Sequence, residues 1–164
     1  MGGEIRMKGE ERQVKRKVVY VDMDGVLVDF DSAFPKLPDP ILAEYQGRED
    51  EIPGIFSLMD PVPGAIESFV ALAERFDVYV LSTSPWKNPS AWSDKLLWIK
   101  KHLGNHAHKR LIITHHKDLN LGDYLIDDRL KHGVDRFVGE HIHFSSERFP
   151  DWESVLDYLL EPEL

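Results

Sequence analysis

The chain has 164 residues, 42% of them hydrophobic and 30% charged, which is the balance of one soluble globular domain with its own core. Its formal net charge of -9 argues against a nucleic-acid polymer as partner, because duplex binding depends on many lysine and arginine contacts to phosphates. The chain lacks cysteine and has no apolar run near the ~20 residues of a membrane span, so we expect a cytoplasmic protein without disulfides or membrane insertion.

Residues 1–16 contain few apolar side chains and several basic ones, a composition typical of a flexible N-terminal extension. The sequence does not open with the charged and then apolar pattern of a signal peptide. We therefore expect the fold to begin near Lys17. The composition leaves the oligomeric state open, a homodimer included.

The first predicted strand is the apolar run 18–21, and two carboxylates, Asp22 and Asp24, follow it directly. A continuous β-branched and aromatic run suits a parallel strand covered on both faces, and ligands of open α/β sheets bind just beyond the carboxyl ends of such strands. Gly25 lets the chain turn away, so side-chain and main-chain oxygens can converge on one small volume. Clustered oxygens of this kind suit Mg²⁺.

The same Asp-x-Asp-Gly pattern is short enough to occur by chance, and it also opens many calcium-binding loops. An EF-hand loop needs a further Asp or Asn at its fifth position and a Glu at its twelfth, where this chain has Val26 and Ala33. It also follows a helix, whereas a strand is expected here. A magnesium site is therefore favoured over a calcium loop.

The segment after Phe30 is irregular and predicts a small cap insertion over residues 31–60, with one short helix near 41–46. Six prolines punctuate this part of the chain: Pro35, Pro38, Pro40, Pro53, Pro61 and Pro63. Residues 17–30 and 61–164 would then form the core domain.

From Gly64 onward, short apolar strands alternate with amphipathic helices. The predicted strands are 77–81, 110–114, 124–126 and 141–144. The predicted helices carry apolar faces at Ile66, Phe69, Val70 and Ala73, then at Trp92, Leu96, Ile99 and Leu103 with an end at Gly104, and finally at Trp152, Val155, Leu156 and Leu159. This alternation predicts the α/β class, a Rossmann-like parallel sheet with helices on both faces.

Polar side chains follow the other strands as well, and the parallel arrangement should gather them along one edge of the sheet. They are Ser82, Thr83 and Ser84 after the second strand, Lys117 a few residues after the third, and Asp127 with Asp128 after the fourth. Carboxylates are established covalent nucleophiles toward phosphate, so this set predicts phosphoryl transfer through an aspartate.

In this interpretation Asp22 attacks phosphorus, and Asp24 first protonates the leaving alcohol and then deprotonates the attacking water. Mg²⁺ would be held by Asp22, the Asp24 carbonyl and one acid of the Asp127–Asp128 pair. The Thr83 hydroxyl and Lys117 would contact the phosphate. The expected partner is a small phosphorylated substrate.

These motifs, in this order and at strand ends, resemble those of the haloacid dehalogenase superfamily of Mg²⁺-dependent phosphatases over most of residues 18–160. Asp-Met-Asp-Gly-Val-Leu-x-Asp-Phe at 22–30, Thr-Ser-Pro at 83–85 and Leu-Ile-Asp-Asp-Arg at 125–129 are similar to the small 5′(3′)-deoxyribonucleotidases. The resemblance implies removal of phosphate from deoxynucleoside monophosphates.

The same resemblance implies a role for each matching residue. Asp22 becomes the nucleophile, Asp24 the acid/base and a metal ligand, Asp128 the direct metal ligand and Asp127 a supporting or alternative ligand. Thr83 and Lys117 become phosphate contacts, and Phe30 a wall of the nucleoside pocket, unless Phe30 is a core residue under the cap.

Other contacts stay open at this stage. The cap is shorter than in mammalian members of the family, and Phe34, Tyr45, Phe56 and Trp86 are candidates for a base-stacking surface or for a small cap core. Ser84 and Lys87 are candidate substrate contacts. Lys95 competes with Lys87 for phosphate, although its simplest position is the solvent face of its helix.

Two further readings of the chain compete with a nucleotidase. One keeps the chemistry but places a sugar phosphate or another small phosphoester in the cap pocket. The other is a non-catalytic nucleotide- or phosphate-binding regulator, against which the retention of both Asp22 and Asp24 speaks. The paired histidines, such as His115 and His116, do not match zinc-site spacings, so we expect them to be solvated or hydrogen-bonded.

Overall fold

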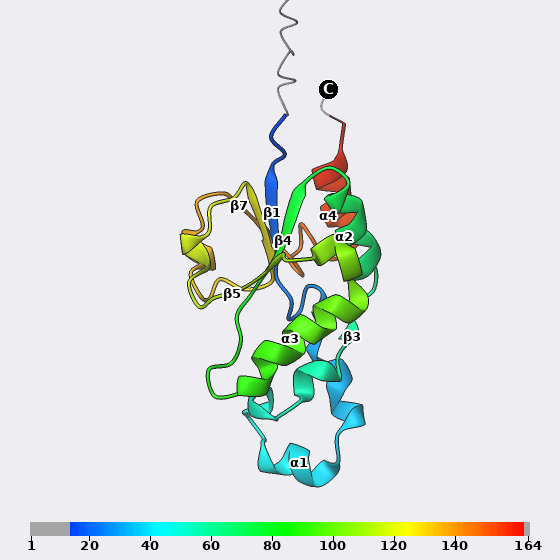
Figure 1. The fold of residues 1–164 in the computed structure, drawn as a ribbon, viewed down its shortest axis with the longest axis vertical. Coiled ribbons are helices and arrows are strands. Elements are labelled where there is room, and N and C mark those ends of the chain that lie inside the picture. The colour runs from blue at the N-terminus through cyan, green and yellow to red at the C-terminus, as the bar shows by residue number, and fades with distance from the viewer. Residues whose placement is uncertain (1–13, 163–164) are drawn as a thin grey trace, which may run out of the picture.

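In the computed structural model, which describes residues 14–162, five parallel strands form one sheet (Figure 1). The strands are β1 (Val18–Val21), β4 (Asp77–Ser82), β5 (Leu111–Ile113), β6 (Tyr124–Asp127) and β7 (Glu140–His143). Their order is β5-β4-β1-β6-β7, so β1 is central and pairs with β4 and β6. The α/β class is confirmed, and every predicted strand is present within one residue of its expected bounds. The expected flexible extension, residues 1–16, lies mostly outside the described residues.

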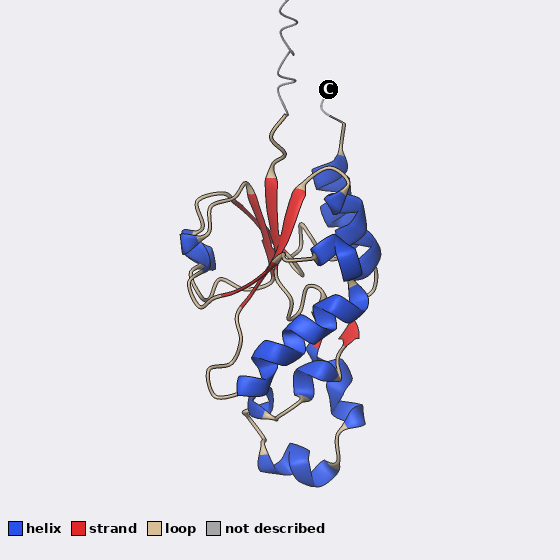
Figure 2. Cartoon of the chain, viewed as in Figure 1, coloured by secondary structure: helices blue, strands red, loops and turns tan. Residues whose placement is uncertain are grey.

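Both faces of the sheet are covered. Successive residues of β1 point to opposite faces and contact the elements that cover each one. Val19 belongs to the larger core cluster, which includes buried residues of α2 (Ala65–Ala73) and α4 (Trp152–Leu160). Tyr20 points the other way into a smaller cluster with residues of the 3-10 helix η6 (Val134–Arg136). Figure 2 shows α2 and α4, which Figure 1 labels, on one side of the strands and a short helix on the other side.

A loop of short helices extends away from the sheet between two small antiparallel strands, β2 (Val28–Asp29) and β3 (Asp60–Pro61) (Figure 1). It contains η1 (Phe30–Lys36), α1 (Asp39–Glu44), η2 (Glu49–Glu51) and η3 (Ile55–Ser57). The predicted short helix corresponds to α1, two residues earlier than expected. The segment between β2 and β3 coincides closely with the expected insertion 31–60, whose status as a separate cap stays a prediction.

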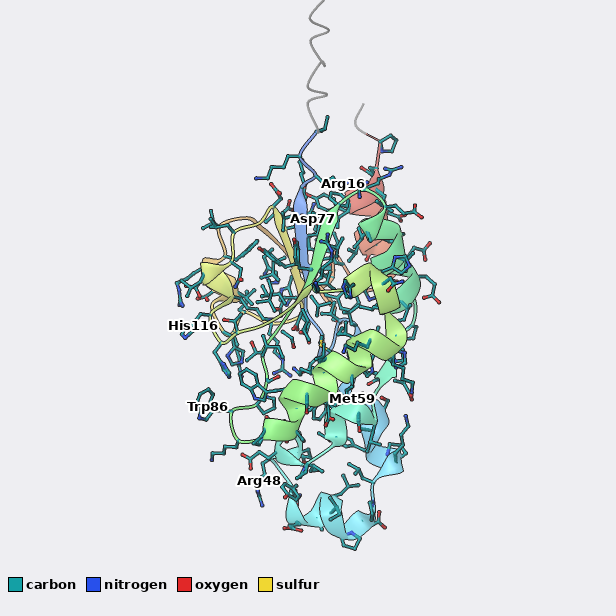
Figure 3. The ribbon with its side chains drawn as sticks, viewed as in Figure 1. Arg16, Arg48, Met59, Asp77, Trp86 and His116 are labelled. Carbon is teal, nitrogen blue, oxygen red and sulfur yellow. The ribbon has the colours of Figure 1, made fainter. Side chains whose placement is uncertain are left out.

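Helix α3 (Pro89–His102) packs against both this inserted segment and the sheet. η4 (Gly104–Ala107) follows α3 in the chain. Trp98 Nε1 on α3 donates a hydrogen bond to the carbonyl of Met59 at 2.9 Å, and Figure 3 labels Met59 where the two segments meet. Asn88, just before α3, donates to the carbonyls of Asp50 and Ile52 at 2.9 and 3.0 Å. These bonds fix the inserted segment against the core.

The predicted apolar face of α3 is partly wrong. Leu96 is 42% exposed, whereas Lys95 and Trp98 are buried together with Ile99 and Leu103. The buried face is rotated because α3 packs against the inserted segment as well as the sheet, which a local pattern of apolar residues does not reveal. Within residues 14–162, no helix has the length and apolarity that crossing a membrane requires.

Candidate active site

The carboxyl ends of the central strands open onto a cleft of about 570 Å³, a volume in the range of small-ligand sites. Eight of the nine predicted site residues lie in its wall. They are Asp22, Asp24, Phe30, Thr83, Ser84, Lys117, Asp127 and Asp128. The ninth, Lys87, is exposed and is not part of this wall. The rule that parallel strands direct functional residues to one edge therefore assembles the site as expected.

Asp22 and Lys117 form the buried centre of the site. The backbone N–H of Asp22 donates to the carbonyl of Ile126 at 2.9 Å, which ties Asp22 to β6. Lys117, at the start of η5 (Lys117–Leu119), donates from Nζ to Asp22 Oδ1 at 2.9 Å and to Asp127 Oδ2 at 2.6 Å. Burial lowers the pKa of Lys117, but the charges of Asp22 and Asp127 outweigh it and raise that pKa above its usual value. The lysine is therefore charged and offsets the carboxylates.

Asp24 has one carboxylate oxygen held and the other free. Lys95 Nζ donates to Asp24 Oδ2 at 3.2 Å, while Asp24 Oδ1 is buried and has no hydrogen-bond partner within residues 14–162. Burial raises the pKa of Asp24 above its ordinary value, although the nearby Lys95 lowers it in part. A raised pKa favours the protonated carboxyl, which is the form that a general acid needs.

The expectation that Lys95 extends from the solvent face of its helix is wrong. Its side chain is 0% exposed, and Nζ also donates to Ser82 Oγ at 2.8 Å and to the Thr83 carbonyl at 2.6 Å. A lysine is rarely buried without partners, and these partners come from the end of β4 and the turn after β1. Because they are distant in sequence, the helical pattern gave no sign of them.

Asp22, Asp127 and Asp128 can each place one carboxylate oxygen within 4.8 Å of the others. Asp127 already uses both oxygens, because Oδ2 accepts from Lys117 and Oδ1 accepts from the N–H of Arg129 at 2.9 Å. Asp128 Oδ1, in contrast, is buried without a partner among the residues that the structure describes. Of the pair, Asp128 therefore has the oxygen available for a cation.

The electrostatics of this cluster also fit a cation. Burial, followed by the charge of Asp22, raises the pKa of Asp127 to about 6 and the pKa of Asp128 to about 7. Crowded carboxylates resist ionisation unless a positive charge joins them. Three hard oxygen donors with one unpaired atom suit Mg²⁺, which prefers carboxylate oxygen and few protein ligands.

Two backbone features hold Asp127 and Asp128 in place. His141 and His143, on β7, donate from Nε2 to the carbonyls of Asp127 and Asp128 at 2.9 and 3.1 Å. Gly25 has a φ of +80°, and a Cβ added there would lie 2.2 Å from Asp128 Oδ2. Glycine at this position therefore permits both the turn and the close approach of the carboxylate.

Thr83 and Ser84 follow β4 at the cleft. The Thr83 hydroxyl donates to the Thr114 carbonyl at 2.7 Å, so its proton is already engaged in this conformation. Ser84 Oγ is buried and has no partner within the described part of the chain. Of the two hydroxyls, Ser84 is the one with an unused donor.

The candidate aromatic side chains differ in how they meet the cleft. Phe30 lies in its wall and packs against Phe34 and Phe56 with ring centroids 5.7 and 5.8 Å apart. Phe56 also lines the cleft but is 3% exposed, whereas Trp86 lines it with 80% of its surface exposed. Figure 3 shows Trp86 projecting from its loop on the side of the molecule where His116 lies. Phe34 and Tyr45 are not part of the wall.

Several cleft residues were not singled out as site residues in the sequence. His115, Arg129, Lys131 and His132 bring further basic or titratable groups to the core side of the wall, and Glu49 and Asp50 come from the inserted segment. Arg129 could have been found because it directly follows the Asp127–Asp128 pair. His115, Lys131 and His132 lie on loops, and Glu49 and Asp50 lie in the short helix η2, without a local signal that marks them.

Comparison with known proteins shows the family to which this chain belongs. The family model described as 5′ nucleotidase, deoxy (pyrimidine), cytosolic type C protein matches residues 45–154. A Vibrio phage KVP40 protein named "Putative 5′(3′)-deoxyribonucleotidase" is 52% identical over 155 residues, which cover 94% of this chain and 91% of that protein. The chain belongs to the 5′(3′)-deoxyribonucleotidase family. It is thus an enzyme of the phosphoric monoester hydrolase class.

More distant relatives agree with this assignment. The human cytosolic 5′(3′)-deoxyribonucleotidase is 32% identical, with 84% of this chain and 78% of the human protein covered. The crystal structure of a protein described as the "putative HAD-hydrolase YfnB from Bacillus subtilis bound to magnesium" has a TM-score of 0.61 at 13% identity, and the match covers 89% of this chain and 99% of that chain. At that identity the likeness shows a shared fold, which is the HAD-like fold that the motifs predicted.

Proposed function

We propose that this nucleotidase hydrolyses deoxynucleoside monophosphates through an aspartyl-phosphate formed on Asp22, with the help of Mg²⁺. The observation that carries the proposal is the arrangement of two carboxyl groups in one cleft, each with its own lysine. Lys117 contacts Asp22, and Lys95 contacts Asp24. Asp22 is thereby paired with a cation as the nucleophile, and Asp24 has a raised pKa that suits proton transfer.

The residues present fit a magnesium ion. Asp22 and Asp128 would hold it through their carboxylates, with Asp127 supporting them through Lys117 and the N–H of Arg129. The unpaired, buried Asp128 Oδ1 supports this assignment, because such an atom is costly without a partner. When bound, the ion would neutralise phosphate oxygens against the carboxylates.

The chemistry then proceeds in two steps by this chain's own residues. Asp22 attacks phosphorus, the bond from phosphorus to the ester oxygen breaks, and the leaving nucleoside oxygen takes the proton of Asp24. Water next attacks the phosphorus of the aspartyl-phosphate and gives its proton to Asp24, which restores Asp22 and releases phosphate. Lys117, and Ser84 with its free hydroxyl, would stabilise the transferring group.

The nucleoside would occupy the outer part of the cleft, between the inserted segment and the core. Phe30, at the point where the inserted segment begins, and the exposed Trp86 offer apolar ring surface there. We therefore propose residues 31–60 as a cap that closes over the base, with residues 17–30 and 61–164 as the core domain. The absence of cysteine fits a reaction in the cytoplasm.

The test is phosphate release from a panel of nucleoside monophosphates, sugar phosphates and an aryl phosphate, with Mg²⁺ and with a chelator. Chelator-sensitive turnover that favours deoxynucleotides is the expected result. A preference for a sugar phosphate would keep the mechanism and refute the substrate. No turnover of any ester, together with Mg²⁺-dependent nucleotide binding, would indicate a binding protein instead.

The covalent mechanism is tested by Asp22→Asn, which should abolish turnover and leave the fold intact. Asp157→Asn is the matched control, because Asp157 is exposed on α4 and outside the cleft. Activity of Asp22→Asn near the wild-type level would rule out Asp22 as the nucleophile.

A further inference from the structure

Lys95 is a buried cation that the catalytic scheme above does not use directly. It is not part of the cleft wall and has 0% exposure, so it does not reach the substrate. Moving an ammonium group out of water is costly unless its hydrogen bonds are replaced. A lysine kept in such a place must act through the groups that it contacts.

The contacts of Lys95 use each of its three N–H donors. The acceptors are Asp24 Oδ2 at 3.2 Å, Ser82 Oγ at 2.8 Å and the Thr83 carbonyl at 2.6 Å. Ser82 and Thr83 belong to the end of β4 and the residue after it, which are parts of the rigid sheet edge. Lys95 therefore links the Asp24 carboxyl to a fixed point of the core.

A fourth contact comes from the inserted segment. The ammonium of Lys95 lies over the ring of Phe56, 4.8 Å from its centroid, which is a favourable cation–π distance. Phe56 in turn packs against Phe30, which lines the cleft. The position of Asp24 is thus tied through one side chain to both the sheet edge and the aromatic group of the insertion.

We propose that Lys95 is a positioning residue that orients Asp24 for proton transfer to the leaving group. By binding Oδ2, it fixes how the Asp24 carboxyl group is turned at the cleft, because Oδ1 has no partner among the described residues that could hold the group. Each of the two buried lysines then contacts a different carboxyl group: Lys117 contacts the nucleophile, and Lys95 contacts the acid. This inference rests on the proposed function of the site.

Two substrates with different leaving groups distinguish a positioning role of Lys95 from a purely structural one. A nucleoside alkoxide is a poor leaving group and needs a proton, whereas para-nitrophenolate departs without one. We expect Lys95→Met to lower kcat/KM about 100-fold for a deoxynucleoside monophosphate and less than about 5-fold for para-nitrophenyl phosphate, since proton transfer contributes factors of this size. The ratio kcat/KM is used because it reports on the steps up to departure of the leaving group.

Lys100→Met is the matched control, because Lys100 is an exposed lysine on the same helix and outside the cleft wall. It should leave both kcat/KM values within about twofold of the wild type, as surface substitutions generally do. If Lys95→Met fails to fold by circular dichroism, Lys95→Gln is the second variant, because its amide can still donate to the Thr83 carbonyl. The same split between the two esters is expected.

Equal losses for both esters in a folded Lys95 variant would overturn the positioning role and show a structural one. That result is distinct from failure of the proposed function, which would appear as wild-type protein that releases phosphate from neither ester in Mg²⁺. In that case the inference falls with the function on which it rests.

Discussion

Replacing Gly25 with alanine should weaken Mg²⁺ binding in addition to straining the backbone of the turn. Gly25 has a φ of +80°, where an alanine costs about 1 kcal/mol or more in backbone strain. In addition, the new Cβ would lie 2.2 Å from Asp128 Oδ2 and 2.9 Å from its Cγ. Ordinary contact begins near 3.4 Å, so the carboxylate must retreat by about 1 Å.

A retreat of that size matters because Mg²⁺ holds its ligands at about 2.0–2.1 Å in near-ideal octahedral geometry. We expect Gly25→Ala to raise the Mg²⁺ concentration for half-maximal phosphate release by about tenfold or more, the size of loss seen when metal ligands are disturbed. The assay is a Mg²⁺ titration of initial rate, alongside urea denaturation of the same preparation.

Gly47→Ala is the matched control. Gly47 has the same φ of +80°, but a Cβ there would meet nothing within 4 Å. Both variants should lose about 1 kcal/mol of unfolding free energy from the shared strain, and only Gly25→Ala should change the Mg²⁺ titration. Identical titrations for the two variants would refute the view that Asp128 holds the ion where the structure places its carboxylate.

Three further predictions concern the same cluster. Asp128→Asn should raise the Mg²⁺ requirement while Asp157→Asn does not, and an unchanged titration of Asp128→Asn would transfer the ligand role to Asp127. Because burial raises the pKa of Asp127 to about 6 and that of Asp128 to about 7, the folded metal-free protein binds more protons than the unfolded chain between about pH 4 and pH 7. As the pH rises across that window, the unfolding free energy of the metal-free wild type should therefore decrease relative to that of Asp128→Asn. Urea denaturation of both proteins in the presence of a chelator measures the difference. Mg²⁺ should stabilise the wild type more at pH 7.5 than at pH 5, and an equal stabilisation at both values would contradict the assigned pKa directions.

The sequence was sufficient to predict the acidic part of the site because the signal there is local. Asp22, Asp24, Asp127 and Asp128 each follow an apolar strand directly, and parallel pairing brings strand ends together without further information. Lys117 was found for the same reason, since it follows β5 closely. The strands themselves are continuous apolar runs, which is the clearest pattern that a buried parallel sheet produces.

Lys95 could not be predicted in this way because its environment is made by distant segments. Its nearest acceptor in sequence is 12 residues away, and Asp24 is 71 residues away. A helical pattern assigns a lysine to the solvent side by default, and the true buried face of α3 depends on the inserted segment that covers it. The same dependence explains why Leu96 was expected inside and is 42% exposed.

In the proposed function, the inserted segment would serve both proton transfer and substrate recognition. α3 holds it through Asn88 and Trp98, and Phe56 covers the ammonium of Lys95. Because these contacts are buried, the aromatic wall near Phe30 and the Asp24 carboxyl cannot move independently. If residues 31–60 are the cap that we propose, the exposed Trp86 would leave part of the base uncovered, while the contacts of Lys95 would still hold the Asp24 carboxyl group. Substitutions at the rim should consequently change which nucleotide is preferred, whereas substitutions along α3 should change how fast any ester with a poor leaving group is cleaved.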